Sequence, residues 1–182
     1  MRVISGIRRG LKLKCIEGET TRPTTDRVKE SVFNIIQTHL PADEVLDLFA
    51  GSGALGIEAL SRYSGHCVFV EQDKQAFACI KQNLENAKFS DNATMILRDA
   101  NTFLATCSSR FDIIFLDPPY NKGLLAPVFD MISKNRLLKD DGIIVVETEK
   151  DGEDTEHTDF QVVRRATYGK TTVTILERGD NK

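Results

Sequence analysis

A short element at positions 117–120 combines an acid, two prolines and an aromatic ring directly after an apolar run. Its residues are Asp117, Pro118, Pro119 and Tyr120. Successive prolines stop a strand and hold the backbone extended. The Asp117 carboxylate and the Pro118 carbonyl could accept hydrogen bonds from an exocyclic amine of a nucleic-acid base, while the Tyr120 ring stacks on the base. We expect these four residues to catalyse the transfer of a chemical group to such an amine. The alternative is that they form only a rigid turn.

A glycine motif of the form G-x-G-x-x-G begins at Gly51, includes Gly53, and lies between an apolar run and a helical segment. Glycines let the backbone turn tightly and approach a ligand without an intervening side chain. The same pattern occurs at NAD, FAD and S-adenosylmethionine (SAM) sites. It also occurs in strand-to-helix turns that bind nothing. The motif therefore favours a cofactor loop but does not identify the cofactor.

Acidic residues at the ends of neighbouring apolar runs favour SAM. Asp47, four residues before Gly51, suits the ammonium group of a methionine moiety and would repel a pyrophosphate. Glu71 could accept hydrogen bonds from ribose hydroxyls, which fits NAD equally well. Asp99 could hold an adenine amine, cap the next helix, or do both. The predicted cofactor-binding residues are Asp47, Phe49, Gly51, Gly53, Glu71 and Asp99.

Composition excludes several classes of protein. The four cysteines and three histidines are scattered without metal-ligand spacing. A metal is also not needed for methyl transfer from a sulfonium, which depends mainly on proximity and orientation. The net charge is -3, so the chain as a whole is not a basic nucleic-acid binder. No apolar run approaches the roughly 18 residues of a membrane span, and the N-terminus lacks a signal-peptide core. We expect a cytoplasmic protein without a metal.

Short apolar runs alternate with helical segments through the middle of the chain. The expected strands are 45–49, 67–70, 94–97, 112–116 and 143–146, and the expected helices are 54–62, 73–88 and 124–134. This alternation predicts an α/β fold of the Rossmann-like type, with a mostly parallel, doubly wound sheet. The strand at 143–146 is entered through a turn at 140–142. The final strands, 160–166 and 171–177, are separated by a short turn and should form an antiparallel hairpin.

The N-terminal region precedes this pattern. Residues 3–4 and 11–13 flank two glycines and predict a β-hairpin, and a helix should begin near Asp26 with Thr24 or Thr25 as its N-cap. Residues 1–14 carry five basic side chains and no acid, which is compatible with contact to a polyanion. We expect a single domain over 1–182, in which an extension at 1–40 precedes the core at 41–182.

The chain resembles the RsmD family of bacterial small-subunit ribosomal RNA guanine-N2 methyltransferases over nearly its full length. The resemblance rests on residues 2–6 together with 9–10, and on residues 21–30, 47–56 and 117–120. The elements at 2–10 and 21–30 are the most particular to that family. It implies methylation of the N2 amine of one guanine, with SAM at the predicted cofactor residues. It also implies a ribosomal RNA or small-subunit partner, with Arg22, Thr24 and Arg27 near the substrate entrance. A monomer would suffice.

Four alternatives remain open at this stage. A DNA adenine-N6 methyltransferase fits the element at 117–120, although no extra domain for reading DNA is evident. A protein amide methyltransferase would be expected to carry Asn in place of Asp117. An NAD-dependent oxidoreductase fits the glycine motif but not Asp47. A catalytically silent RNA-binding module would not need the acidic residues.

Overall fold

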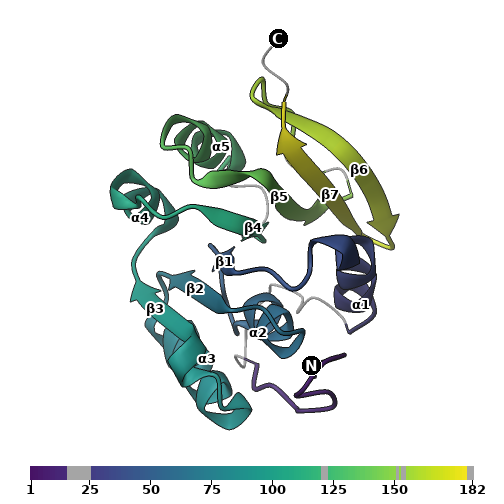
Figure 1. The fold of residues 1–182 in the computed structure, drawn as a ribbon, viewed down its shortest axis with the longest axis vertical. Coiled ribbons are helices and arrows are strands. Elements are labelled where there is room, and N and C mark those ends of the chain that lie inside the picture. The colour runs from purple at the N-terminus through teal and green to yellow at the C-terminus, as the bar shows by residue number, and fades with distance from the viewer. Residues whose placement is uncertain (16–25, 120–122, 151, 153–154, 180–182) are drawn as a thin grey trace.

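The computed structural model describes residues 1–182 except 16–25, 120–122, 151, 153–154 and 180–182 (Figure 1). A seven-stranded sheet has the order β3-β2-β1-β4-β5-β7-β6. Its strands are β1 (Glu44–Asp47), β2 (His66–Glu71), β3 (Ala93–Leu97), β4 (Phe111–Leu116), β5 (Leu138–Glu149), β6 (Phe160–Tyr168) and β7 (Thr171–Arg178). The helices are α1 (Asp26–Ile35), α2 (Ala54–Ser61), α3 (Lys74–Ala87), α4 (Ala100–Thr106) and α5 (Leu125–Lys134).

Strands β1 to β5 pair in parallel, and β7 pairs antiparallel with both β5 and β6. The strand order reverses between β1 and β4, which is where open α/β sheets bind ligands. Asp47 is the last residue of β1 and pairs with Phe115 of β4, so Asp117 lies just beyond the neighbouring strand end. The topology thus brings the two predicted functional acids to one edge of the sheet.

Alternate residues of each central strand face opposite sides of the sheet, and each side is covered by helices. Val45 belongs to a core shared with α1, α2 and α3, whereas Leu46 belongs to a core shared with α4 and α5. In Figure 1, α4 and α5 lie on one side of the sheet and α1 and α2 on the other. The predicted doubly wound, mostly parallel sheet with a terminal antiparallel pair is confirmed.

One local prediction is wrong. Strand β5 begins at Leu138, so residues 140–142 lie within a strand and were wrongly predicted to be a turn before it. The pairing with β4 changes register there, from Phe111 with Leu138 to Ile113 with Ile143. Between these two pairs β5 has more residues than β4. These additional residues form an irregularity in the strand ladder, and the strand continues beyond them.

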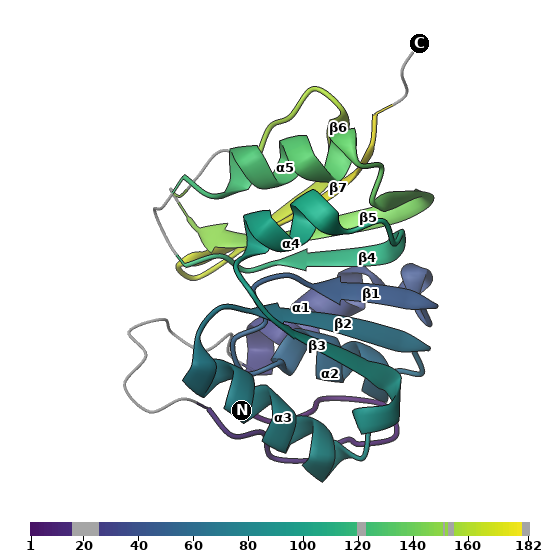
Figure 2. The same ribbon diagram turned by 90° about the vertical axis from the view of Figure 1, so that its left-hand side faces the viewer.

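The N-terminal hairpin is held by few backbone contacts. One antiparallel bridge joins Arg2 and Lys12, and Gly10 N donates to Val3 O at 2.8 Å. Val3 and Leu13 nevertheless belong to the core beneath α1, α2 and α3. Helix α1 begins at Asp26 as expected, whereas the predicted caps Thr24 and Thr25 lie outside the described residues. Figure 2 shows the N-terminal segment running alongside α2 and α3.

A fully buried acid, Glu58 in α2, joins the hairpin and α1 to the core. Its carboxylate lies 3.1 Å from Lys29 Nζ, and it accepts hydrogen bonds from the backbone amides of Ile4 and Ser5. Arg62 donates to the same carboxylate from one turn further along α2. Burial lowers the pKa of Lys29, and the Glu58 charge opposes that shift. Every oxygen of this buried acid is therefore engaged, as a buried charge requires.

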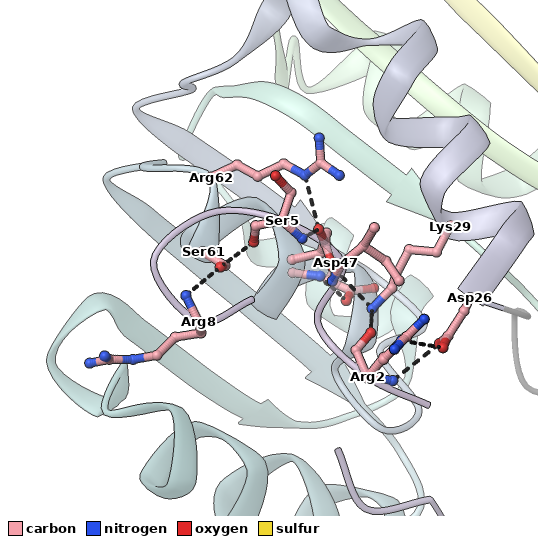
Figure 3. Close-up of polar contacts among 11 residues, drawn as sticks. Arg2, Ser5, Arg8, Asp26, Lys29, Asp47, Ser61 and Arg62 are labelled. Atoms are coloured by element: carbon pink, nitrogen blue, oxygen red, sulfur yellow. Dashed lines mark hydrogen bonds and ion pairs between the residues drawn. The ribbon is translucent and has the colours of Figure 1, made fainter. Parts of the chain in front are cut away.

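The hairpin also approaches the end of α2 through Ser61. Ser61 Oγ donates to Ser5 O at 2.6 Å and accepts from Arg8 N at 3.0 Å. Gly6 has a positive φ of 82°, and a Cβ there would lie 1.7 Å from Ser61 O. Only glycine permits so close a contact between the two backbones. Figure 3 shows these contacts, with Arg62 and Ser61 on one side and Lys29 beside Arg2 and Asp26.

Replacing Lys29 with Met should lower the free energy of unfolding by about 3 kcal/mol, because it leaves a buried carboxylate without its lysine partner. Urea denaturation of the purified protein measures this. The control is Arg2→Ala, which breaks the exposed pair between Arg2 and Asp26 and should cost about 1 kcal/mol or less. Equal losses in the two variants would contradict the structural role given to the buried pair.

Candidate functional site

Asp47, at the end of β1, holds the glycine loop that connects β1 to α2. Gly53 occupies the N-cap position of α2 with a φ of 78° and has no side chain to accept a hydrogen bond. Asp47 Oδ2 instead accepts from the Gly56 amide at 3.0 Å. A carboxylate at a helix N-terminus satisfies an otherwise unpaired donor and interacts favourably with the helix dipole. Asp47 thus caps α2 from a different element.

Asp47 is 2% exposed, and its environment is unusual for an acid. The pKa of Asp47 is raised to about 7, chiefly by burial and also by the negative charges of Asp117 and Glu71, while the Gly56 hydrogen bond acts in the opposite direction. The side chains that shift this pKa by their charge are therefore both acidic. A cationic group bound at this edge of the sheet would relieve the repulsion and favour the ionised form.

Glu71 holds the glycine loop from the neighbouring strand. Its Oε2 accepts from Gly51 N and its Oε1 from Asp73 N, both at 2.8 Å. A carboxylate has about four acceptor positions, so each oxygen can accept one further hydrogen bond, for example from a ribose hydroxyl. Asp73 in turn caps α3 by accepting from the amides of Gln75 and Ala76.

The motif glycines serve different purposes. Gly51 has a φ of 53°, and a Cβ there would meet nothing within 4 Å, so the loop presents bare backbone to open space. Gly56, by contrast, allows α2 to pack on β2, because a Cβ there would lie 2.4 Å from the Phe69 ring. The predicted role of Gly51 beside a ligand is consistent with this geometry, and the role of Gly56 is packing.

The element at 117–120 begins immediately after β4. Asp117 is half-buried, Pro118 is buried and Pro119 is half-buried. Asp117 is close enough to Asp47 to raise its pKa, which brings the predicted catalytic acid and the predicted cofactor acid to the same place. Tyr120 lies outside the described residues.

Two other predicted cofactor residues have visible structural roles. Asp99 is exposed and is the N-cap of α4, where its side chain accepts from Thr102 N at 2.9 Å. The hydrogen bond with Thr102 lowers the pKa of Asp99. Phe49 is partly buried against the core under α4 and α5. Neither role prevents contact with a ligand at the same edge.

The predicted substrate-side residues are only partly described. Arg27 is exposed in the first turn of α1, while Arg22 and Thr24 lie outside the described residues. Several cations of the N-terminal hairpin make contacts within the protein: Arg2 pairs with Asp26, and Arg8 lies over the Phe89 ring. Arg9 and Lys12 are exposed. Fewer charges are thus available to a polyanion than the sequence suggests.

Three residues that shape the site were not predicted from the sequence. Glu58 and Lys29 form the buried pair beneath the hairpin, and Asn83 contacts both the hairpin and the glycine loop. A lone acid in the otherwise apolar helix 54–60 was the available signal for Glu58. The pairing of Asn83 with distant backbone left no comparable pattern in the sequence.

Within the described parts of the chain, no group of three or more His, Cys, Asp or Glu side chains is arranged to hold a metal ion. In the same parts, none of the helices is both long enough and apolar enough to cross a bilayer.

Comparison with known proteins agrees with this architecture. A solved structure of a candidate methyltransferase from Escherichia coli superimposes with a TM-score of 0.87 at 37% identity, covering 98% of this chain and 97% of that one. A candidate ribosomal RNA methyltransferase of Bacillus subtilis is 43% identical and covers 98% of this chain and 99% of its own. Ribosomal RNA small subunit methyltransferase D of Escherichia coli is 36% identical, covering 98% and 90%.

The fold and the edge at which its acids meet define a Rossmann-like methyltransferase. The model of the family described as conserved hypothetical protein 95 matches residues 1–177. The chain belongs to this family, and the resemblance to RsmD proteins inferred from the sequence is confirmed.

Asp47→Asn should stabilise the ligand-free protein at pH 8 and change little at pH 4. Because the folded-state pKa of Asp47 is raised from 3.8 to about 7, the folded protein binds more protons than the unfolded chain between these values. Its stability therefore falls as pH rises through this window. The effect corresponds to at most about 4 kcal/mol at pH 8.

Denaturant unfolding of both proteins from pH 4 to pH 8 measures this difference. Asp73→Asn is the control, because it replaces an exposed N-cap acid by an equally good cap. If the difference in free energy of unfolding between Asp47→Asn and the parent protein stays constant with pH, the raised pKa of Asp47 is contradicted.

Proposed function

We propose that this protein transfers a methyl group from SAM to the exocyclic N2 amine of a guanine in small-subunit ribosomal RNA. The observation that carries the proposal is the meeting of Asp117 and Asp47 at the carboxyl ends of β4 and β1, where the strand order reverses. The names of the relatives from Escherichia coli and Haemophilus influenzae, both ribosomal RNA small subunit methyltransferase D, support the substrate.

The site fits a cationic cofactor. Asp47 is buried among negative charges, so an ammonium group of a methionine moiety would supply the missing cation. The open space at Gly51 admits a ligand against the backbone, and Glu71 keeps acceptor positions for ribose hydroxyls. Asp99 and Phe49 complete the proposed cofactor-binding set. When bound, SAM supplies a methyl group already activated by its sulfonium.

The residues after β4 prepare the nucleophile. An exocyclic amine is a poor nucleophile because its lone pair is delocalised into the ring. Hydrogen bonds from that amine to the Asp117 carboxylate and the Pro118 carbonyl would localise the lone pair and orient it, while Pro119 holds the backbone extended. Transfer would form an N–C bond and break the bond from the methyl carbon to the cofactor sulfur, which would leave as a neutral thioether; the amine would give up one proton, and the Asp117 carboxylate would accept it. We assign Tyr120 to stacking on the base.

The RNA would reach this edge past α1. We assign Arg22, Thr24 and Arg27 to substrate contact, with the exposed Arg9 and Lys12 available to phosphates. A base within a helix would have to be flipped out. We further propose a single-domain, monomeric, cytoplasmic protein that acts on ribosomal RNA or the small subunit. The burial of Val3 and Leu13 in the main core supports folding of the extension with the core as one unit.

The direct test is transfer of labelled methyl from SAM to ribosomal RNA taken from cells that lack the gene, with genomic DNA alongside, followed by nucleoside analysis. Label in N2-methylguanosine at one site is the expected result. Label in DNA adenine would overturn the substrate and support the alternative DNA adenine-N6 activity. If the protein binds SAM but labels neither nucleic acid, both the RNA guanine activity and the DNA adenine activity are overturned.

Asp117→Ala should lower kcat by about a hundredfold or more while changing the dissociation constant of SAM by less than about threefold, because its proposed partner is the base amine. Single-turnover transfer and SAM titration measure the two quantities separately. Asp117→Asn is the matched variant: it keeps an acceptor oxygen and loses the charge. Equal loss of transfer and of SAM affinity in Asp117→Ala would assign the side chain to the cofactor instead.

A further inference from the structure

Asn83 is a polar residue in the middle of α3 whose side chain is fully buried. Its Oδ1 accepts from Lys14 N at 2.8 Å, and its Nδ2 donates to Lys14 O at 3.1 Å. The same nitrogen donates to Ser52 O at 2.9 Å and lies 3.6 Å from Cys79 Sγ. An amide group offers two N–H donors and one carbonyl acceptor, so each is used.

Ser52 is the residue of the glycine loop that Asn83 contacts. It lies between Gly51 and Gly53, which have φ values of 53° and 78°. The peptide unit that joins Ser52 to Gly53 is held by two hydrogen bonds: Gly53 N donates to Ala50 O at 2.6 Å, and Ser52 O accepts from Asn83. The hydrogen bond from Asn83 ties this peptide unit to α3, and Glu71 ties the Gly51 amide to the end of β2.

Lys14 is the other partner, and it belongs to the N-terminal arm (residues 11–14). Asn83 binds the Lys14 residue at both its N–H and its C=O, and the Cys79 thiol donates to Lys14 O at 3.3 Å. One side chain therefore contacts both the arm and the glycine loop. If the arm moves away from α3, the Asn83 amide loses two of its partners and is free to rotate away from Ser52.

We propose that Asn83 is a positioning residue that couples the N-terminal arm to the cofactor loop. Displacing the arm weakens cofactor binding, and cofactor binding strengthens the hold on the arm by the same factor, as linkage requires. This inference rests on the proposed function for the identity of the cofactor. It adds a route by which contact of RNA with the N-terminal region adjusts the affinity for SAM.

The first experiment measures SAM binding without RNA. Asn83→Ala should raise the dissociation constant of SAM about tenfold or more, while kcat at saturating SAM stays within about threefold, because the catalytic acid is untouched. Gln82→Ala is the matched control: it removes the neighbouring contact to Lys14 Nζ, does not touch the loop, and should leave SAM affinity unchanged. Unchanged affinity in Asn83→Ala, or an equal loss in Gln82→Ala, would overturn the proposal.

The coupling itself is tested from the arm. Lys14→Pro removes the N–H that Asn83 accepts and should weaken SAM binding several-fold, whereas Lys14→Ala keeps the backbone contacts and should not. In the Asn83→Ala background, Lys14→Pro should add no further loss. Equal effects of Lys14→Pro in both backgrounds would show that the arm acts by another path and would overturn the coupling.

A measurement on the unmodified protein covers the case in which Asn83→Ala does not fold. Saturating SAM should slow amide hydrogen exchange at Lys14 and leave exchange at Gly10, whose amide bonds to Val3 O, unchanged. Equal exchange rates at Lys14 with and without SAM would overturn the inference. Failure of the protein to bind SAM at all would instead refute the proposed function, so the two failures are distinguishable.

Discussion

The hydrogen bond from the Gly56 amide to the Asp47 carboxylate sets the geometry on which the site depends. The loop before α2 needs Gly53 in a left-handed conformation, and glycine cannot cap the helix that it begins. The cap therefore comes from the end of β1 and is a buried acid. This arrangement fixes the loop to the sheet. It also leaves a buried carboxylate near two other acids, at the place where we propose that a cationic ligand binds.

A second acid on the same helix connects the site to the N-terminus. Glu58 lies one turn beyond Leu55 in α2 and gathers contacts from Lys29, Arg62 and the backbone of the hairpin. Asn83 on α3 ties the far end of that hairpin to the glycine loop. The N-terminal region is thus attached to the two helices that frame the loop, and its position and the position of the cofactor loop are physically linked.

The sequence predicted the elements better than it predicted the contacts between them. Continuous apolar strands and the amphipathic helix α3 were evident because burial on both faces of a parallel sheet leaves a strong pattern. The meeting of Asp47 and Asp117 followed from the topology. The strand start at Leu138 was missed because an acidic pair and a glycine look like a turn. The lone acid in an apolar helix signalled Glu58 but not its distant partner Lys29, and no local pattern records the contacts of Asn83.

Asp47 is a buried acid with a pKa raised to about 7, and we propose that it ionises when a cationic ligand binds beside it. Calorimetric titration of SAM near pH 7, in buffers of different ionisation enthalpy, counts the protons exchanged on binding. With a pKa of about 7 in the free protein, roughly half a proton should be released as Asp47 ionises beside the bound ammonium, and Asp47→Asn should lose this release. Identical proton counts in the two proteins would contradict the account.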